Sequence, residues 1–255
     1  MSKDEGDLRW AKQRMRTNSY FFEWDFDLME EEYLEGFDDN SYLMKTLYEF
    51  NTGRYEEALK TAKARAELYP TCGTCQAYLA NALFFMGKTQ EAKKVIGQNF
   101  ELFNDNYQFL REAALLSYYL GAYEMSQEAL RVIRFTFNDN SPTTLFLIAV
   151  NHNINGDVSV EKETLEILLE QYHNQNSGSP AWNLAKYYAH KGEYENSLTW
   201  LQRSFERRDV EMIWLRTEPL FAPLRKDTRY LEIYKNVGFP VPPAVVPEDV
   251  ARAIQ

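Results

Sequence analysis

The chain has 255 residues, of which 45% are hydrophobic and 26% charged, with 38 acidic against 28 basic side chains. The formal charge of −10 argues against nucleic acid as the main partner, because binding to phosphates requires a basic face. No run of about 18 uncharged apolar residues occurs and the first residues lack the apolar core of a signal peptide, so we expect no membrane span. The expected location is the cytoplasm, with the periplasm or export left open if an N-terminal leader or anchor has been removed.

Residues 1–38 are predicted to form a degenerate helical hairpin that caps one end of the chain. Residues 1–6 are polar, and apolar residues at helical spacing predict a short helix over residues 7–16, stopped near residues 17–19.

The stretch that follows, residues 20–37, fits two patterns. Phe22, Trp24 and Phe26 alternate with acidic residues as in a strand, whereas Trp24 and Leu28 also have helical spacing. We predict a helix, because the sequence FDDN that ends the stretch resembles the sequence FNDN at two later helix boundaries. Asn and Asp at such boundaries cap the next helix by accepting its free backbone N–H groups.

A glycine recurs at regular intervals through residues 39–211. Intervals of 34, 34, 35 and 36 residues separate five glycines, which are Gly53, Gly87, Gly121, Gly156 and Gly192. Each stands between two amphipathic patterns of helical period, and a glycine in that place typically ends a helix in a left-handed conformation. The sequence therefore predicts five copies of a helix hairpin.

This repeat resembles that of the tetratricopeptide repeat (TPR) family, whose unit has 34 residues. Three positions carry the resemblance: an aromatic residue two places after the glycine (Tyr55, Tyr123, Tyr194), a small residue before it (Ala80, Ala114, Ala149, Ala185), and a small residue after it (Ala58 and Ala92, replaced by Ser126 and Ser197). The resemblance implies an all-α fold, a right-handed α-solenoid of about five hairpins over residues 39–211. In this family the first helix of each hairpin lines the concave face.

Between the first two units lies the sequence Cys72-Gly73-Thr74-Cys75. A C-x-x-C pair at a helix start is a redox pair, half of a zinc site, or two ordinary cysteines. No second cysteine pair exists and the three histidines are scattered, so we expect two ordinary cysteines and no metal, with a labile local disulfide as the alternative. The sequence alone does not decide whether they are bonded.

The segment after the fifth unit is predicted to cover the exposed last hairpin. Residues 206–240 resemble the ending of bacterial TPR arrays, which stand alone or are attached to regulators, cyclases or kinases. We assign residues 212–240 to capping helices, with Trp214 and Phe221 buried against the fifth hairpin, and residues 241–255 to a proline-containing tail. A helical turn is expected at residues 248–254.

The TPR resemblance also implies where a partner binds. Twelve residues map to the concave groove as candidate binding residues: Phe50, Asn81, Phe84, Phe85, Arg111, Tyr118, Tyr119, Phe146, Asn153, Trp182, Lys186 and His190. We expect the aromatic ones to be partly exposed, with Arg111 and Lys186 orienting an acidic or C-terminal group of a peptide. Two alternatives are that several of them are buried between hairpins, and that the chain's own tail occupies the groove.

No constellation of catalytic residues is present, because the sequence lacks a phosphate-binding glycine loop, a nucleophile elbow and a metalloprotease motif. We therefore expect no enzyme and no cofactor. The predicted function is a scaffold or adaptor for a protein or peptide partner, with a homo-oligomer left open. The alternative is the sensor or assembly module of a bacterial multidomain transcriptional or signalling regulator, separated from its effector.

Overall fold

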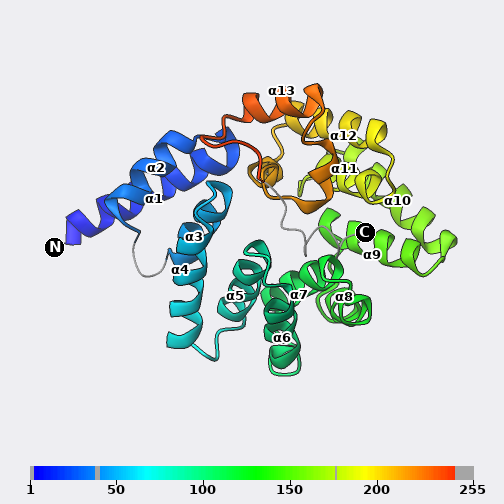
Figure 1. Cartoon of the computed structure of the whole chain (residues 1–255), viewed down its shortest axis with the longest axis horizontal. Coiled ribbons are helices and arrows are strands. Elements are labelled where there is room, and N and C mark those ends of the chain that lie inside the picture. Colours follow the sequence, from blue (N-terminus) through cyan, green and yellow to red (C-terminus); the bar gives the residue numbers. More distant parts are fainter. Residues whose placement is uncertain (1–2, 38–40, 176, 245–255) are drawn as a thin grey trace.

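The structure, a computed structural model, describes residues 3–37, 41–175 and 177–244, and within these residues it contains helices and no strand (Figure 1). This confirms the predicted all-α fold. In chain order the helices are α1 (Lys3–Glu23), α2 (Phe26–Glu35), α3 (Tyr42–Asn51), α4 (Tyr55–Leu68), α5 (Gly73–Phe85), α6 (Thr89–Asn99), α7 (Tyr107–Tyr119), α8 (Tyr123–Phe137), α9 (Pro142–Ile154), α10 (Val158–His173), α11 (Pro180–His190), α12 (Tyr194–Glu206), the 3₁₀ helices η1 (Val210–Trp214) and η2 (Pro219–Leu224), and α13 (Thr228–Val237). The helical turn expected at residues 248–254 lies outside the described residues.

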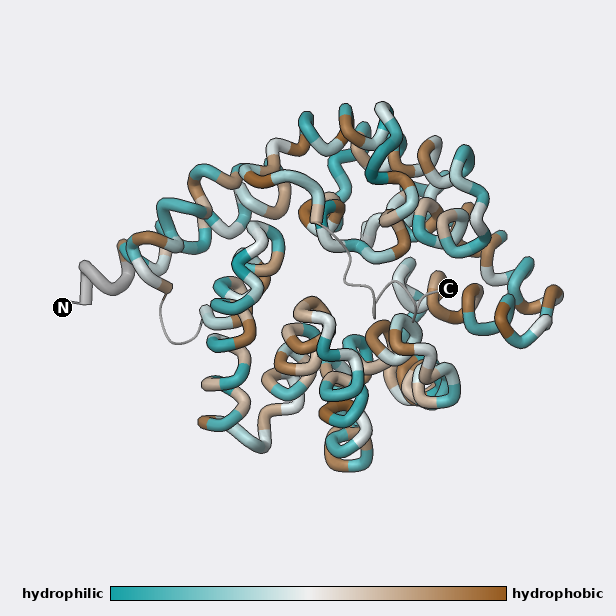
Figure 2. The backbone as a smooth tube through the Cα atoms, in the orientation of Figure 1, coloured by the Kyte–Doolittle hydropathy of each residue, from teal (hydrophilic) through white to brown (hydrophobic). Residues whose placement is uncertain are grey.

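Helices α3 to α12 form five hairpins that stack side by side into a curved array (Figure 1). Each turn inside a hairpin contains one repeat glycine, and all five have positive φ angles, between 66° and 80°. This conformation is open to glycine and resisted by residues with a Cβ atom, so the local sequence determines where each helix turns back. Figure 2 shows hydrophobic and hydrophilic residues alternating along the helices, as amphipathic helices require.

The two serines that replace the family's alanine occupy buried positions without leaving a hydroxyl unpaired. Ser126 Oγ donates to the carbonyl of Ala114 at 2.9 Å, and Ser197 Oγ donates to the carbonyl of Ala185 at 2.8 Å. In both hairpins the acceptor is the small residue of the preceding helix. The close approach of the two helices is therefore retained, because the hydroxyl forms a hydrogen bond across the contact.

The N-terminal hairpin differs in detail from the prediction. Helix α1 runs through residues 17–19, where a stop was expected, and ends at Glu23. Arg16 explains why the two helices pair: its guanidinium is buried and forms ion pairs with Glu31, Glu32 and Glu35 of α2. Several acidic residues of this strongly acidic segment thus hold the hairpin together.

The array bends until its two ends meet. The Trp24 ring stacks on Phe205 of α12 at 5.5 Å between ring centroids, and Arg208 lies 4.8 Å from the centroid of the same indole. Phe26 of α2 contacts Phe239, which follows α13, at 4.8 Å. Figure 1 shows α1 and α2, in blue, approaching the orange and red end of the chain. The fold is a closed curve, and its inner face is the concave face expected from the sequence.

The two cysteines are bonded, so the interpretation as two ordinary cysteines is wrong. A disulfide joins Cys72 and Cys75 at the start of α5, with their Cα atoms 5.2 Å apart. A local disulfide, kept as the alternative, is the state that the structure shows.

Candidate functional site

A segment of the chain itself lies on the concave face. The crossing segment, residues 210–224, comprises η1, η2 and the four residues between them, and Figure 1 shows it in orange inside the curve of the array. Residues 215–221 are all buried. The C-terminal part of the chain therefore caps the last hairpin and also fills much of the groove.

Arg216 connects the crossing segment to the first hairpin, about 160 residues earlier in the chain. Its Nη1 atom donates to the Tyr55 hydroxyl at 2.6 Å and to the Phe50 carbonyl at 3.4 Å. A Cβ atom on Gly53 would lie 2.7 Å from Nη2 of the same guanidinium. Gly53 thus provides both the turn and the space for this contact, and Arg216 bridges the groove from its last hairpin to its first.

Glu218 connects the same segment to the third and fifth hairpins. Its carboxylate accepts the Tyr119 hydroxyl at 2.8 Å and pairs with the Lys186 ammonium at 3.3 Å, and both charged side chains are buried. Burial, and then the negative charge of Glu218, raise the pKa of Tyr119 well above its ordinary value, so the phenol keeps the proton that it donates. The interaction expected between Lys186 and an acidic group of a peptide is made here within the chain.

The crossing segment also packs the ring of Phe221 on the fifth hairpin. Phe221, completely buried in η2, meets Trp182 edge to face at 5.1 Å between ring centroids. As predicted, Phe221 packs against the fifth hairpin. Trp214 was also expected to be buried, but it is half-buried, because it lines the pocket that the segment leaves open.

The expectation that the groove aromatics are partly exposed is wrong for most of them. Phe84 is 1% exposed, Trp182 3%, Tyr118 4% and Tyr119 5%, and only Phe85 is half-buried. The crossing segment covers two of these rings, because Phe221 packs on Trp182 and Glu218 accepts the Tyr119 hydroxyl. Tyr118 packs instead on Phe146 of α9 and His190 of α11. The alternative of burial holds for these residues: Tyr118 is buried between hairpins, and Trp182 and Tyr119 are covered by residues 210–224.

What remains of the groove is a pocket of about 190 Å³, the concave pocket, between α5, α7, α11 and the crossing segment. Eight of the twelve candidate residues line it: Phe50, Asn81, Phe84, Phe85, Arg111, Tyr119, Trp182 and Lys186. Tyr118, Phe146, Asn153 and His190 do not. Residues that sequence reasoning missed also line it, chiefly Tyr78, Glu112, Thr143, Glu211 and Glu218.

The pocket contains one cation that is not already paired within the described residues. Arg111 is half-buried, with its guanidinium 5.7 Å from the centroid of the Tyr107 ring. Glu112, the next residue, accepts a hydrogen bond from the Asn81 amide at 2.9 Å. Glu211 has a buried carboxyl oxygen with no hydrogen-bond partner among the described residues, and burial raises the pKa of this carboxyl. Arg111 is thus the group best placed to receive an anion.

His190 and its neighbours form a polar network beside the pocket. The Tyr118 hydroxyl donates to His190 Nδ1 at 2.8 Å, and His190 Nε2 donates to the Asn153 amide oxygen at 3.1 Å. Burial, followed by repulsion from Lys191, lowers the pKa of His190 to about 4. These residues join α7, α9 and α11, so the neutral imidazole holds three hairpins together.

His190→Gln is expected to flatten the acid limb of the stability curve. Between pH 6.5 and pH 4 the unfolded chain gains a proton on His190 that the folded chain does not, so stability falls as the pH is lowered through this window. The full effect is roughly 3 kcal/mol, and the variant lacks it. Urea unfolding at a series of pH values measures the slope. His173→Gln, at an exposed histidine, is the control; equal slopes for the two variants would contradict the prediction.

The described residues offer neither a membrane span nor a metal site. No helix among them is long and apolar enough to span a membrane. No group of three or more His, Cys, Asp or Glu side chains within the described part of the chain is arranged to hold a metal ion.

Comparison with known proteins bears on the fold. A scan against models of protein families matches none, and a search of curated proteins finds no match. Among solved structures, the chain is similar to one in the crystal structure of the APC/C hetero-tetramer Cut9-Hcn1, with a TM-score of 0.54 and 14% identity over 93% of this chain and 48% of that one. The chain thus spans about half the length of the solved chain. At this identity the likeness shows the fold alone, and that fold is a TPR-like α-solenoid of helical hairpins.

Proposed function

We propose that the protein is a non-catalytic scaffold that binds a partner protein through a short peptide. One bulky side chain of the peptide enters the concave pocket, and a carboxylate of the peptide pairs with Arg111. A protein partner, rather than nucleic acid, agrees with the net charge of −10.

The observation that carries the proposal is the way in which the concave face holds the crossing segment. An acidic side chain, Glu218, pairs with a cation of the face, and an aromatic side chain, Phe221, packs on one of its rings. The part of the face that stays open offers the same two features, in Arg111 and Phe85. A peptide with an acidic residue and a bulky apolar residue therefore matches the open cation and the open aromatic ring of the concave face.

The size of the pocket sets what enters it. A volume of about 190 Å³ lies below the roughly 300–1,000 Å³ of most small-molecule sites, so a single side chain is a better match than a cofactor or a whole helix. Residues 215–221 are buried, and displacing them would expose a large part of the core. The peptide thus binds beside the crossing segment and leaves it in place.

Arg111→Ala is expected to weaken peptide binding by about 10- to 100-fold, because a hydrogen bond to a charged group is worth roughly 1.5–3 kcal/mol. Peptides selected from a displayed library against the full chain, then titrated by calorimetry, provide the measurement. Phe85→Ala should weaken the same peptides. Tyr119 is not a useful target, because its hydroxyl is engaged by Glu218.

Arg131→Ala is the matched control, since this exposed arginine pairs with Glu128 on α8, away from the pocket lining. It should bind the peptides as the parent does. The proposal is contradicted if the selected peptides lack an acidic residue, or if they bind Arg111→Ala as tightly as they bind the parent protein. Either result would mean that the binding surface lies elsewhere.

A further inference from the structure

The disulfide between Cys72 and Cys75 joins two residues of unequal exposure. Cys72 is the residue that caps α5 and is half-buried, whereas Cys75, in the first turn of the helix, is 1% exposed. A reagent that approaches from solvent therefore reaches Cys72 first. Thiol–disulfide exchange depends on which sulfur is open to attack. This asymmetry therefore favours attack on Cys72, with Cys75 as the leaving group.

The helix start favours negative charge on Cys72. Its sulfur accepts the backbone N–H of Cys75 at 3.1 Å, at the end of the helix where the dipole is positive. A thiolate released at Cys72 would keep this hydrogen bond, which is the arrangement that makes a cysteine reactive in exchange.

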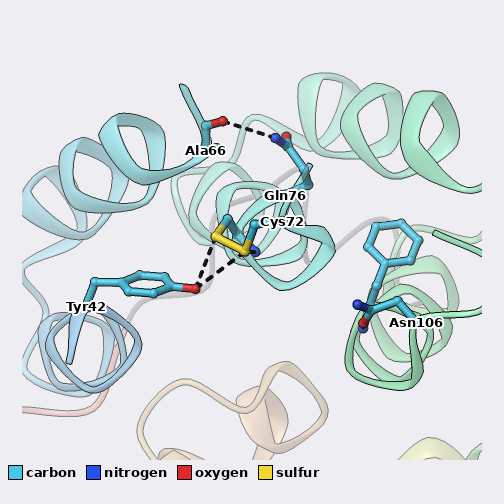
Figure 3. Close-up of a disulfide and its surroundings, with 7 residues drawn as sticks. Tyr42, Ala66, Cys72, Gln76 and Asn106 are labelled. Atoms are coloured by element: carbon cyan, nitrogen blue, oxygen red, sulfur yellow. Dashed lines mark hydrogen bonds between the residues drawn. A yellow bond between two sulfur atoms is a disulfide. The ribbon is translucent and has the colours of Figure 1, made fainter. Parts of the chain in front are cut away.

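A tyrosine from the first hairpin covers the other sulfur. The Tyr42 hydroxyl lies 3.1 Å from Cys75 Sγ and 3.7 Å from Cys72 Sγ, and Figure 3 shows it directed at the bond. Burial, opposed by Arg65, raises the pKa of Tyr42, so the hydroxyl remains protonated at neutral pH and is able to donate to sulfur. The Arg65 guanidinium lies 4.3 Å from the centroid of the Tyr42 ring, on which it places a positive charge.

The turn that contains the two cysteines is held firmly by the next hairpin. A Cβ atom on Gly73 would lie 3.0 Å from Phe103 Cγ and 3.2 Å from Phe109 Cβ, so a larger residue would require these neighbours to shift by a few tenths of an ångström. Asn106, also drawn in Figure 3, caps α7 by accepting the N–H of Phe109 at 2.9 Å. The two cysteines therefore stay close together when the bond between them is broken.

We propose that the Cys72–Cys75 disulfide is a thiol–disulfide exchange site for a small thiol or dithiol. The thiolate of the reagent attacks Cys72 Sγ, a mixed disulfide forms there, and Cys75 leaves as a thiolate that receives a hydrogen bond from Tyr42. A second thiolate attacks the reagent's sulfur and releases Cys72. The protein disulfide gains two electrons and two protons, and two reagent thiols are oxidised to one disulfide. The reverse sequence, with a disulfide reagent, restores the bond.

The folded full-length chain tests this exchange directly. Dithiothreitol in the absence of denaturant should reduce the bond completely, with the circular dichroism unchanged, and oxidised glutathione should restore it. In a Cys75→Ser variant, oxidised glutathione should form a mixed disulfide at Cys72, which mass spectrometry detects. Cys75 in a Cys72→Ser variant should react at least about tenfold more slowly, because it is buried. Reduction that requires denaturant, or equal trapping at both cysteines, would overturn the proposal.

Two further measurements test the same exchange in proteins that keep both cysteines. In the reduced parent protein, a limiting amount of iodoacetamide should label Cys72 before Cys75; the opposite order overturns the proposal. Tyr42→Phe should slow reduction by roughly three- to tenfold, the value of one hydrogen bond. Tyr107→Phe is the matched control, because Tyr107 begins α7 as Tyr42 begins α3 and its hydroxyl donates to Asp139 instead. If both tyrosine variants are reduced at the parental rate, Tyr42 has no part in the exchange.

Discussion

Phe221→Ala is expected to lower the free energy of unfolding by about 3–5 kcal/mol, the usual cost of removing a fully buried phenylalanine. The ring is 0% exposed and meets Trp182 edge to face, so its loss leaves a cavity between η2 and α11. Chemical denaturation monitored by circular dichroism measures the change. Leu231→Ala on α13 is the control, since Leu231 is 40% exposed and should contribute little.

The helices that lose stability in Phe221→Ala are as informative as the total change in the free energy of unfolding. In an open solenoid each repeat contacts only its neighbours, so a defect at the fifth hairpin loosens that hairpin first. Here Arg216 of the crossing segment binds Phe50 and Tyr55 of the first hairpin. Hydrogen exchange in Phe221→Ala should therefore increase in α3 and α4 as well as in α11 and α12. Unchanged protection in α3 and α4 would show that the crossing segment does not couple the two ends.

The repeat could be predicted from the sequence because its determinants are local. A glycine at each turn adopts a positive φ whatever surrounds it, and Ala80, Ala114, Ala149 and Ala185 are all completely buried where their helices meet. These features depend on a few neighbouring residues and on hairpin packing, which a single sequence records. The helical hairpins were predictable for this reason.

The N-terminal hairpin was harder to predict because its apolar residues face two partners. Trp24 adopts a positive φ between α1 and α2 and stacks on Phe205, whereas Phe26 contacts Phe239. Two buried aromatics two positions apart give the alternation of a strand. Their partners lie about 180–210 residues later in the chain, and nothing in the local pattern indicates them.

The filled groove could not be predicted because it depends on the curvature of the whole array. The sequence identified the apolar residues of the cap and placed Phe221 on the fifth hairpin. Whether Arg216 and Glu218 also reach the first and third hairpins depends on small rotations between successive hairpins, which add up around the curve. Tyr78 and Glu112 were missed for a related reason: each lies one or a few positions from a mapped groove residue on the same helix.

Glu218→Gln is expected to destabilise the protein by about 3–5 kcal/mol, because it removes one partner of a buried ion pair and leaves the other charge in place. Lys186 is 3% exposed and lies 4.4 Å from the Phe146 ring centroid, so water does not replace the carboxylate. The glutamine still accepts a hydrogen bond from the Tyr119 hydroxyl. The variant therefore measures the loss of the charge alone. Urea unfolding at pH 7 measures the change.

The double variant Lys186→Met, Glu218→Gln tests the cause of that loss. When both charges are absent no buried charge is left unpaired, so the double variant should recover most of the stability, and a recovery of about 2 kcal/mol or more marks the pair as the origin. Glu195→Gln is the control at an exposed pair with Arg229 and should have a much smaller effect. If Glu218→Gln alone changes the free energy of unfolding little, the carboxylate of Glu211 is balancing the charge of Lys186 in its place. In that case the destabilisation should return in Glu211→Gln, Glu218→Gln, because no acidic side chain of the pocket lining except Glu112 then remains to balance the ammonium.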